Sequence, residues 1–437
     1  MSGDLRRSTE LAETLGVSQP TMSRLLKKLG PTVLRVGNRR STRYIGRRSV
    51  RGVTSPIPVY EVSPQGTTQQ LASLHPVGEL AHWVEQQDGE GRLHGDLPFF
   101  LDGMRPAGFL GRFIPEAHRA LGNPDDIRHW SGDDTLRYLS KHSWDGMGSL
   151  IVGDDSLQQY LNAALKGPPV RISVCDAGQQ YEQIIGEILE SVKVGSSAGG
   201  EQPKFLAFRS EPERQCLVKF TPHLHEVGRR IKDLMVCEHL ALEEIQRAGF
   251  SAAQSNLVEG KDRLFLEITR FDRTAQGRLG LVSLEALDSE YERAGQRGEW
   301  FQTCLRLARR HVIPVEALDA VQFLSAFGRL IGNTDMHDGN LSFFMTGMSV
   351  TELAPAYDML PMMYQPTQGH LRSPPLKPPI PLATDSQRIW KKACEAGLQF
   401  WQNVSQHPLV SKSFQALAQT NERIVMQARS LGDKLPS

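Results

Sequence analysis

Apolar residues in the first thirty positions recur at the spacing of two amphipathic helices. The first set is Leu11, Ala12 and Leu15, and the second set is Met22, Leu25, Leu26 and Leu29. Between them, Gly16 allows a tight turn, Ser18 is a favourable N-cap residue, and Pro20 fits the first turn of a helix. We therefore predict two helices joined by a tight turn, with both apolar faces in a core.

A basic hairpin is predicted directly after these helices. Residues 32–48, TVLRVGNRRSTRYIGRR, contain two β-prone runs joined by Gly37 and Asn38, a dipeptide that favours a hairpin turn. At 100° per residue, Arg24 and Lys27 point away from the apolar face of the second helix. The basic residues of this region therefore gather on surfaces that the predicted core does not use.

The hydrophobic pattern of the next hundred residues is mixed. Residues 52–60, GVTSPIPVY, have two prolines in alternate positions, which is typical of an extended linker or an edge strand. Helix-like runs follow at 77–87 and 133–142, separated by turns rich in Gly and Pro, and residues 148–155 indicate a strand and a turn. This part of the chain indicates no chemistry by itself.

Composition indicates an ordinary globular protein. The 437 residues are enough for two or three domains, and 39% of them are hydrophobic and 23% charged. No apolar run is long enough to cross a bilayer, and no apolar core follows the N-terminal arginines as in a secretory signal. The five cysteines are scattered without metal-site spacing: Cys175, Cys216, Cys237, Cys304 and Cys394. We expect a soluble cytoplasmic protein with reduced thiols and no membrane partner.

The positive charge is concentrated at the N-terminus. Residues 1–51 contain 12 Lys and Arg against 3 Asp and Glu, whereas the rest of the chain contains 38 against 46. This asymmetry predicts an anionic partner for the N-terminal region alone.

Helix, turn, helix and basic hairpin together resemble a winged helix-turn-helix domain. In that family the second helix enters the major groove of DNA and the hairpin contacts backbone phosphates. The candidate DNA-binding residues are Gln19, Ser23, Arg24, Lys27, Arg35, Arg39, Arg40 and Arg43, with Arg47 and Arg48 as further phosphate contacts. The alternative is a solvated basic segment that serves a protein interface or solubility.

A loop of very small side chains lies in the middle of the chain. Residues 194–208 read VGSSAGGEQPKFLAF, and the candidate phosphate-binding residues are Gly195, Ser196, Ser197, Gly199 and Gly200. Such loops let backbone N–H groups approach phosphate oxygens closely. The loop lacks the Gly-Lys-Ser/Thr of a P-loop, and a simple surface turn is the alternative.

A lysine inside the next apolar strand supports a phosphate-binding role for this loop. Lys219 lies within QCLVKFTP (215–222), and a lysine in an apolar strand normally needs an anionic partner. The alternative is a lysine on an edge strand that points at solvent. In kinase-like folds such a lysine contacts the nucleotide phosphates and a helix carboxylate. The predicted helix 229–249 offers Glu238, Glu243 and Glu244. Residues 264–273 are a further apolar strand, placed where such folds hold adenine.

The stretch GNTDMHDGNLSFF (332–344) carries the strongest chemical pattern. Asp335 and Asn340 have the spacing D-x-x-x-x-N, in which the Asp of a kinase deprotonates the attacking hydroxyl and the Asn binds a metal ion. Asp358 follows in ELAPAYDMLP and completes a set of oxygen ligands suited to Mg²⁺. His337 either contacts phosphate or braces the loop.

Four motifs in this order, GSSAGGEQPK, ITRFDR, IGNTDMHDGNLSF and LAPAYDMLP, resemble the HipA-type serine/threonine kinase toxins, and in particular the long members with an N-terminal winged helix. The resemblance implies a mixed α/β, two-lobed kinase-like body that uses ATP and Mg²⁺, phosphorylates a protein and arrests growth. It implies Asp335 as the catalytic base, Asn340 and Asp358 as metal ligands, Lys219 as a phosphate ligand, and Thr269 and Phe271 at the adenine hinge. It also implies self-inactivation by phosphorylation of Ser196 or Ser197.

Two residues depart from the family pattern: Met336 and Gly339 stand where basic residues are usual. This departure leaves the acid–base and metal residues intact but puts phosphate or substrate contacts in question. The Pro-rich stretch 372–381 is expected to be a surface loop.

The expected organisation is a winged helix-turn-helix domain (1–51), a linker (52–60), an N-terminal kinase lobe with the Gly-rich loop (61–268) and a mainly helical C-terminal lobe with the catalytic loop (269–437). Expected partners are DNA, through residues 1–51, and a protein substrate, which in related toxins is an aminoacyl-tRNA synthetase. A homodimer is one option for the assembly. Two alternatives stay open: a transcriptional regulator whose body senses nucleotide without transferring phosphate, and a small-molecule kinase.

Overall fold

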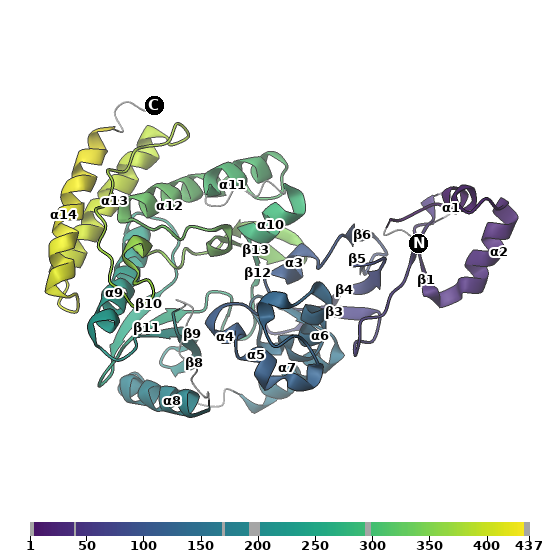
Figure 1. Ribbon diagram of the computed structural model, residues 1–437, viewed down its shortest axis with the longest axis horizontal. Helices are drawn as coiled ribbons and strands as arrows, with labels where there is room; N and C mark the ends of the chain where they lie inside the picture. Colours follow the sequence, from purple (N-terminus) through teal and green to yellow (C-terminus); the bar gives the residue numbers. More distant parts are fainter. Residues whose placement is uncertain (1–3, 39–40, 168–170, 192–201, 293–298, 432–437) are drawn as a thin grey trace. The chain divides into compact units, whose positions relative to one another are not determined.

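The computed structural model describes residues 4–38, 41–167, 171–191, 202–292 and 299–431. The chain divides into two compact units, Met1–Gly167 and Pro168–Ser437 (Figure 1). Within the described ranges, no helix is both long and apolar enough to span a membrane. The predicted site residues outside these ranges are Arg39, Arg40, Gly195, Ser196, Ser197, Gly199 and Gly200.

The first unit begins with a head (residues 4–46) that has the predicted helix-turn-helix. Its elements are α1 (Ser8–Thr14), α2 (Gln19–Leu29), β1 (Val33–Val36) and β2 (Arg43–Gly46), with a 3₁₀ turn at Gly30–Thr32. Gly16 has a φ of 62°, and the Ser18 hydroxyl accepts a hydrogen bond from the backbone N–H of Thr21 at 3.4 Å. The two helices, the turn and the cap are therefore confirmed.

Two details of the head differ from the prediction. Val36 pairs with Arg43, so the hairpin connection runs from residue 37 to residue 42 and is not a turn of Gly37 and Asn38 alone. The core of the head is also smaller than predicted: the buried residues Leu11, Ala12 and Met22 pack with Val17, Leu26 and Tyr44, whereas Leu15, Leu25 and Leu29 are exposed. Two short helices and one hairpin have too few elements to cover the whole apolar stripe.

The remainder of the first unit is built on an antiparallel sheet of strand order β6-β5-β4-β3-β7. The strands are β3 (Ile57–Val62), β4 (Thr68–Val77), β5 (Ala81–Gln86), β6 (Gly91–His94) and β7 (Leu150–Val152). The helices are α3 (Phe99–Asp102), α4 (Gly108–Gly111), α5 (Ile114–Ala117), α6 (Gly132–His142) and α7 (Asp154–Lys166), with 3₁₀ turns at Arg119–Leu121, Ile127–His129 and Ser143–Asp145.

Two predictions for this region are wrong. Residues 77–87, expected to be helical, contain β5, because β5 pairs with β4 on one side and with β6 on the other. The alternative that 52–60 forms an edge strand is also wrong, because β3 lies between β4 and β7. The helix predicted at 133–142 is confirmed as α6, with Ser131 as its N-cap.

The hairpin of the head is joined to this sheet by apolar and polar contacts. Leu34, Val36 and Ile45 pack in one cluster with residues of β4 and β5. Arg47 lies 3.2 Å from His75 Nδ1, and Arg48 donates to Asp133 at 2.6 Å and contacts His82 Nε2 at 2.9 Å. The prediction that Arg47 and Arg48 contact phosphate is wrong, because both guanidinium groups are occupied at this junction.

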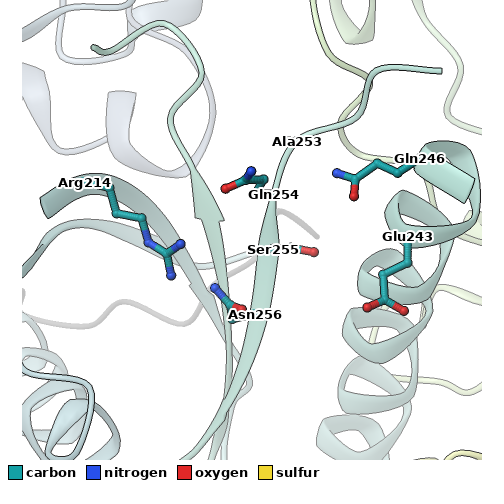
Figure 2. A pocket seen from close by; sticks show the side chains of 7 residues that line it. All are labelled: Arg214, Glu243, Gln246, Ala253, Gln254, Ser255 and Asn256. Carbon is teal, nitrogen blue, oxygen red and sulfur yellow. The ribbon is translucent and has the colours of Figure 1, made fainter. Parts of the chain in front are cut away.

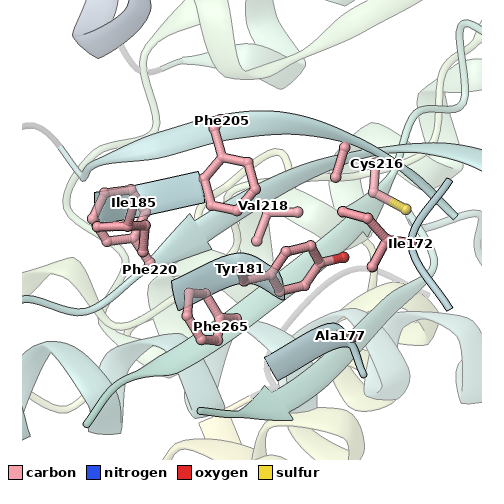
Figure 3. Packing of buried hydrophobic residues seen from close by; sticks show 10 residues of the cluster. Ile172, Ala177, Tyr181, Ile185, Phe205, Cys216, Val218, Phe220 and Phe265 are labelled. Atoms are coloured by element: carbon pink, nitrogen blue, oxygen red, sulfur yellow. The ribbon is translucent and has the colours of Figure 1, made fainter. Parts of the chain in front are cut away.

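The second unit begins with an antiparallel sheet of order β10-β11-β9-β8. Its elements are β8 (Lys204–Ser210), β9 (Glu213–Phe220), β10 (Ser255–Glu259) and β11 (Leu264–Thr269), with the helices α8 (Ala177–Ser191) and α9 (Glu226–Arg247). Tyr181 and Ile185 of α8 pack on Phe205, Val218 and Phe265 of the sheet (Figure 3). The predicted strands at 215–222 and 264–273 and the helix at 229–249 are confirmed within a few residues.

The rest of the second unit is mainly helical. Its helices are α10 (Leu284–Tyr291), α11 (Trp300–Arg309), α12 (Ala317–Ile331), α13 (Gln387–Gln406) and α14 (Lys412–Arg429), with 3₁₀ turns at Asp338–Asn340 and Met362–Tyr364. A small sheet holds β12 (Gly280–Ser283), β13 (Ser342–Thr346) and β14 (Ser349–Leu353). Helix α13 packs against α9, α12 and α14 (Figure 1), and this packing fixes α9 relative to the loop that follows α12.

The Pro-rich stretch 372–381 is a surface loop, as predicted. It has no regular secondary structure, and most of its residues are exposed. Arg230 of α9 donates to the carbonyl of Arg372 at 2.7 Å, and Leu376 is buried. The loop is thus anchored at its start and in its middle.

Candidate active site

Lys219 lies on the face of β9 opposite the hydrophobic cluster under α8. Side chains alternate along a strand, so Cys216, Val218 and Phe220 enter that cluster and Lys219 points the other way. Lys219 is only 5% exposed. Its ammonium group donates to both carboxylate oxygens of Glu238, at 2.7 and 2.8 Å, and to a carboxylate oxygen of Asp358.

The structure selects one of the three carboxylates predicted on the helix. Glu238 lies on the face of α9 that meets β9 and is 1% exposed. Glu243 and Glu244 instead pair with Arg247, the last residue of α9, which lies about one turn further along the helix. Lys219 of β9 is thereby joined to Glu238 of α9 and to the segment that carries Asp358.

These three charges shift one another's pKa values. Burial alone would lower the pKa of Lys219, but the carboxylates of Asp358 and Glu238 outweigh this and raise it. Burial would raise the pKa of Asp358, yet Lys219 holds it below its ordinary value. The pKa of Glu238 is raised, because burial outweighs the attraction of Lys219. The ammonium group of Lys219 therefore stays charged between the two acids.

The loop that follows α12 and carries Asp335 is held together by the hydrogen bonds of two asparagine side chains. Helix α12 ends at Gly332, whose φ is 75°. The buried Asn333 accepts from the backbone N–H of Asp335 at 3.1 Å and donates to the carbonyl of Asp358 at 3.4 Å. Asn340 donates to the carbonyl of Asp335 at 2.9 Å. These bonds bring Asp335, Asn340 and Asp358 into one site, with the Asp335 side chain exposed to solvent.

His337 contacts its own loop and helix α11. Its Nδ1 accepts from the N–H of Gly339 at 3.1 Å, and its carbonyl accepts from the indole N–H of Trp300 at 3.1 Å. At the departure from the family pattern, Met336 packs its sulfur against Gly328 of α12, where a side chain would clash. Methionine thus fills a gap beside the helix at a position where a basic side chain was expected.

The predicted hinge residues lie at the end of β11. The N–H of Thr269 donates to the carbonyl of Gln254 at 2.8 Å, and its hydroxyl is buried without a hydrogen-bond partner. The ring of Phe271 lies 5.8 Å from that of Tyr357 and 6.1 Å from that of Phe344. Phe271 therefore packs beside the residue that precedes Asp358.

The donor set fits a hard divalent cation that keeps some of its water. Because the amide N–H of Asn340 is used on the Asp335 carbonyl, its amide oxygen is left for a ligand. Asp358 has a φ of 52°, a conformation that non-glycine residues rarely adopt and that is typical of functional sites. No group of three or more His, Cys, Asp or Glu side chains that could hold a metal occurs in the described part of the chain. One carboxylate and one amide oxygen are nevertheless a sufficient set for Mg²⁺, which is usually bound with substrate phosphates and water.

Three residues of the site were not singled out in the sequence. Lys204 of β8 lies directly opposite Lys219 in the sheet and helps to lower the pKa of Asp358. Asn333 links the loop to Asp358, and the hydroxyl of Tyr357 donates to the carbonyl of Gly339 at 2.8 Å. All three lie inside the quoted motifs. Their position next to residues with an assigned role is the feature by which the sequence could have revealed them.

A polar cavity of about 260 Å³ lies elsewhere in the second unit. Figure 2 shows it beside Gln254, Ser255 and Asn256, with Glu243 and Gln246 of α9 on the other side. None of the predicted catalytic or metal-binding residues lines it, so it is distinct from the candidate active site.

Comparisons with known proteins show the family of the chain. A family model described as HipA-like C-terminal domain matches residues 196–428, and one described as YjjJ-like toxin, middle domain, matches residues 53–161. Toxin YjjJ of Escherichia coli (strain K12) is 37% identical over 424 residues, which cover 95% of this chain and 93% of that protein.

Of two similar solved structures, the first supports the fold. A chain of the Shewanella oneidensis MR-1 toxin–antitoxin complex of HipA, HipB and operator DNA aligns with a TM-score of 0.53 at 17% identity, over 86% of this chain and 97% of that one. The Helicobacter pylori proinflammatory kinase CtkA aligns with a TM-score of 0.39 at 17% identity, over 56% of this chain and 96% of that one. The predicted fold, a mixed α/β HipA-like body with an N-terminal winged helix-turn-helix, is confirmed.

Proposed function

The chain belongs to the HipA-like toxin family, and we propose that it is an ATP- and Mg²⁺-dependent serine/threonine protein kinase that arrests growth and carries its own DNA-binding head. Its protein substrate would be an aminoacyl-tRNA synthetase or another translation factor, as the resemblance implies. The cytoplasm is the proposed location, consistent with such a target.

The observation that carries the kinase proposal is the buried contact of Lys219 with Glu238 and Asp358. In kinases a strand lysine and a helix glutamate must be in place together, next to the metal-binding aspartate, for phosphoryl transfer to occur. The ion pair places the lysine beside Asp358, where the phosphates of ATP would lie. Lys204, on the neighbouring strand, adds a second cation to the same place.

Each residue of the site has a proposed task. Asp335 would orient the acceptor hydroxyl and take its proton as the hydroxyl oxygen bonds to the γ-phosphorus and the bond to ADP breaks. Asn340 and Asp358 would hold Mg²⁺, which when bound supplies neutralisation of the phosphate charge. Lys219 would hold the phosphates, while Thr269 and Phe271 would lie at the adenine edge. Ser196 or Ser197, both outside the described residues, would accept the inactivating phosphate, which adds about −1.5 to −2 charge to the loop.

The head is proposed to bind DNA through exposed side chains of α2 and the hairpin. Arg24, Lys27, Arg35 and Arg43 are all exposed and free to approach phosphates, as are Gln19 and Ser23 to approach bases. Gln19 also donates to the hydroxyl of Ser8 at 2.7 Å, which ties the start of α2 to α1. Arg39 and Arg40, which lie outside the described residues, are proposed as further phosphate contacts.

The test is the intact mass of the purified protein after incubation with Mg-ATP. Wild type is expected to gain phosphate, Asp335→Asn to lose at least about a hundredfold in rate, and the Ser196→Ala/Ser197→Ala variant to lose the self-modification. Thr334→Ala, an exposed neighbour of Asp335, is the matched control and should behave as wild type. Phosphate gain by Asp335→Asn at the wild-type rate would rule out the proposed base, and no gain by wild type would contradict the kinase proposal.

A further inference from the structure

The head has an apolar groove that none of the head's described residues covers. The groove has a volume of about 800 Å³ and runs between α1 and α2. Its apolar lining is formed by Leu11, Leu15, Met22, Leu25, Leu26 and Leu29. Three of these leucines are well exposed: Leu15 by 61%, Leu25 by 39% and Leu29 by 45%.

Three exposed leucines that line the same groove form a contiguous apolar patch, and such a patch indicates an interface. Single exposed apolar side chains are common on proteins, but a contiguous patch rimmed by polar groups is typical of a binding surface. The stripe also follows a regular helical spacing along α2, so a partner helix could pack along its length. Nucleic acid does not fit this groove, because apolar side chains do not neutralise phosphates.

We propose that this groove is the contact between two copies of the chain, related by twofold symmetry. In such a contact the same patch meets itself, so the patch must carry groups that complement each other. The charged residues of the lining are Asp4, Arg6 and Lys28. Arg6 donates to the hydroxyl of Thr14 at 3.4 Å within the head, whereas Asp4 and Lys28 are exposed and form no ion pair in the described part of the chain. In a pair of heads, Asp4 of one copy can face Lys28 of the other, while the leucines cover one another.

The position of the groove leaves the basic surface of the head open. At 100° per residue, Arg24 and Lys27 point away from Leu25, Leu26 and Leu29 on α2. Two heads joined through their grooves would therefore keep both sets of cations exposed. Helix-turn-helix proteins commonly bind two half-sites as dimers. The pairing itself does not rest on DNA binding or on kinase activity and is measured without either ligand.

The test is sedimentation equilibrium of the full chain over a concentration series, without DNA or nucleotide. Wild type is expected to be a dimer, and Leu25→Lys or Leu29→Lys to weaken the dimer about tenfold or more, because each puts a charge into an apolar contact. Leu165→Lys is the matched control: Leu165 is 87% exposed on α7, outside the groove, and its replacement should change nothing. A monomeric wild type, or a Leu25→Lys dimer as tight as wild type, would overturn the proposal.

A charge exchange separates this contact from a folding defect. Asp4→Lys and Lys28→Asp should each weaken the dimer, because each places like charges opposite one another. The double variant should recover most of the wild-type affinity. If the double variant is as weak as the singles, the twofold arrangement proposed here is wrong.

Discussion

The head and the candidate active site both depend on cations, but they place them in opposite surroundings. Arg24 and Lys27 of the head are exposed, whereas Lys219 is 5% exposed and held by two carboxylates. An exposed cation adds little to stability and is available to a partner. A buried cation is part of the structure, and its removal leaves its acids uncompensated.

The boundary between these two kinds of cation runs within the basic segment itself. Arg43 is exposed, yet Arg48, five residues later, donates to Asp133 and contacts the buried His82. Charge density along the chain therefore does not reveal which basic residues face a partner. Replacing exposed cations and occupied cations should therefore change stability and binding to different extents.

The largest effect is expected for Lys219→Met. Its removal leaves the buried Glu238 and the partly exposed Asp358 without their shared cation, which should cost about 3 kcal/mol of unfolding free energy and abolish phosphate transfer. Denaturant unfolding and intact mass measure the two effects. Lys219→Met/Glu238→Gln should recover part of the stability but none of the activity. If Lys219→Met is as stable as wild type, the contacts of Lys219 with the two carboxylates do not contribute to stability.

A smaller loss is expected for Arg48→Met. It leaves the Asp133 carboxylate and the buried His82 without their donor at the junction of hairpin and sheet. The unfolding free energy of the first unit should fall by about 1–3 kcal/mol. Arg35→Met, on the exposed side of the hairpin, should change it by less than about 0.5 kcal/mol. Equal losses of unfolding free energy in the two variants would contradict the difference between arginines at the junction and exposed arginines.

The same junction should make the first unit sensitive to acid. Burial lowers the pKa of His82 below its ordinary value of 6.5, and burial likewise lowers the pKa of His75. Below pH 6.5 the unfolded chain therefore binds more protons than the folded chain, so stability is full above this pH and falls as the pH decreases. Unfolding in denaturant between about pH 7.5 and 5.5 measures the slope. His82→Gln should flatten it, and an unchanged slope would contradict this assignment.

The smallest effect on stability is expected for Arg24→Gln, which removes one exposed charge. Unfolding free energy should stay within about 0.5 kcal/mol of wild type. Affinity for DNA should fall for all sequences alike, and the slope of log K against log salt should decrease by about 1. Titration of a labelled duplex at several salt concentrations measures both. Lys392→Gln, in the second unit, is a control that should leave the affinity unchanged.

Residues close in sequence made much of the molecule predictable. The two helices of the head, the strand with Lys219, the helix with Glu238 and the helix leading to Asp335 all follow from periodicity and capping, which are local properties. Residues 77–87 were predicted wrongly because their strand pairs on both sides with neighbouring strands, and pairing is not visible in a single segment. Lys204 and Asn333 were missed because their importance depends on what lies opposite them.

The sequence by itself determined the helices and strands that carry the site, the family and the order of the four motifs, because local spacing and residue type suffice for these. Only the tertiary structure decided which of three glutamates meets Lys219, which arginines of the basic segment are occupied, and which leucines of the head stay exposed. Each of these depends on distances between segments far apart in the chain. Those distances are set by packing between segments, which a local pattern does not contain.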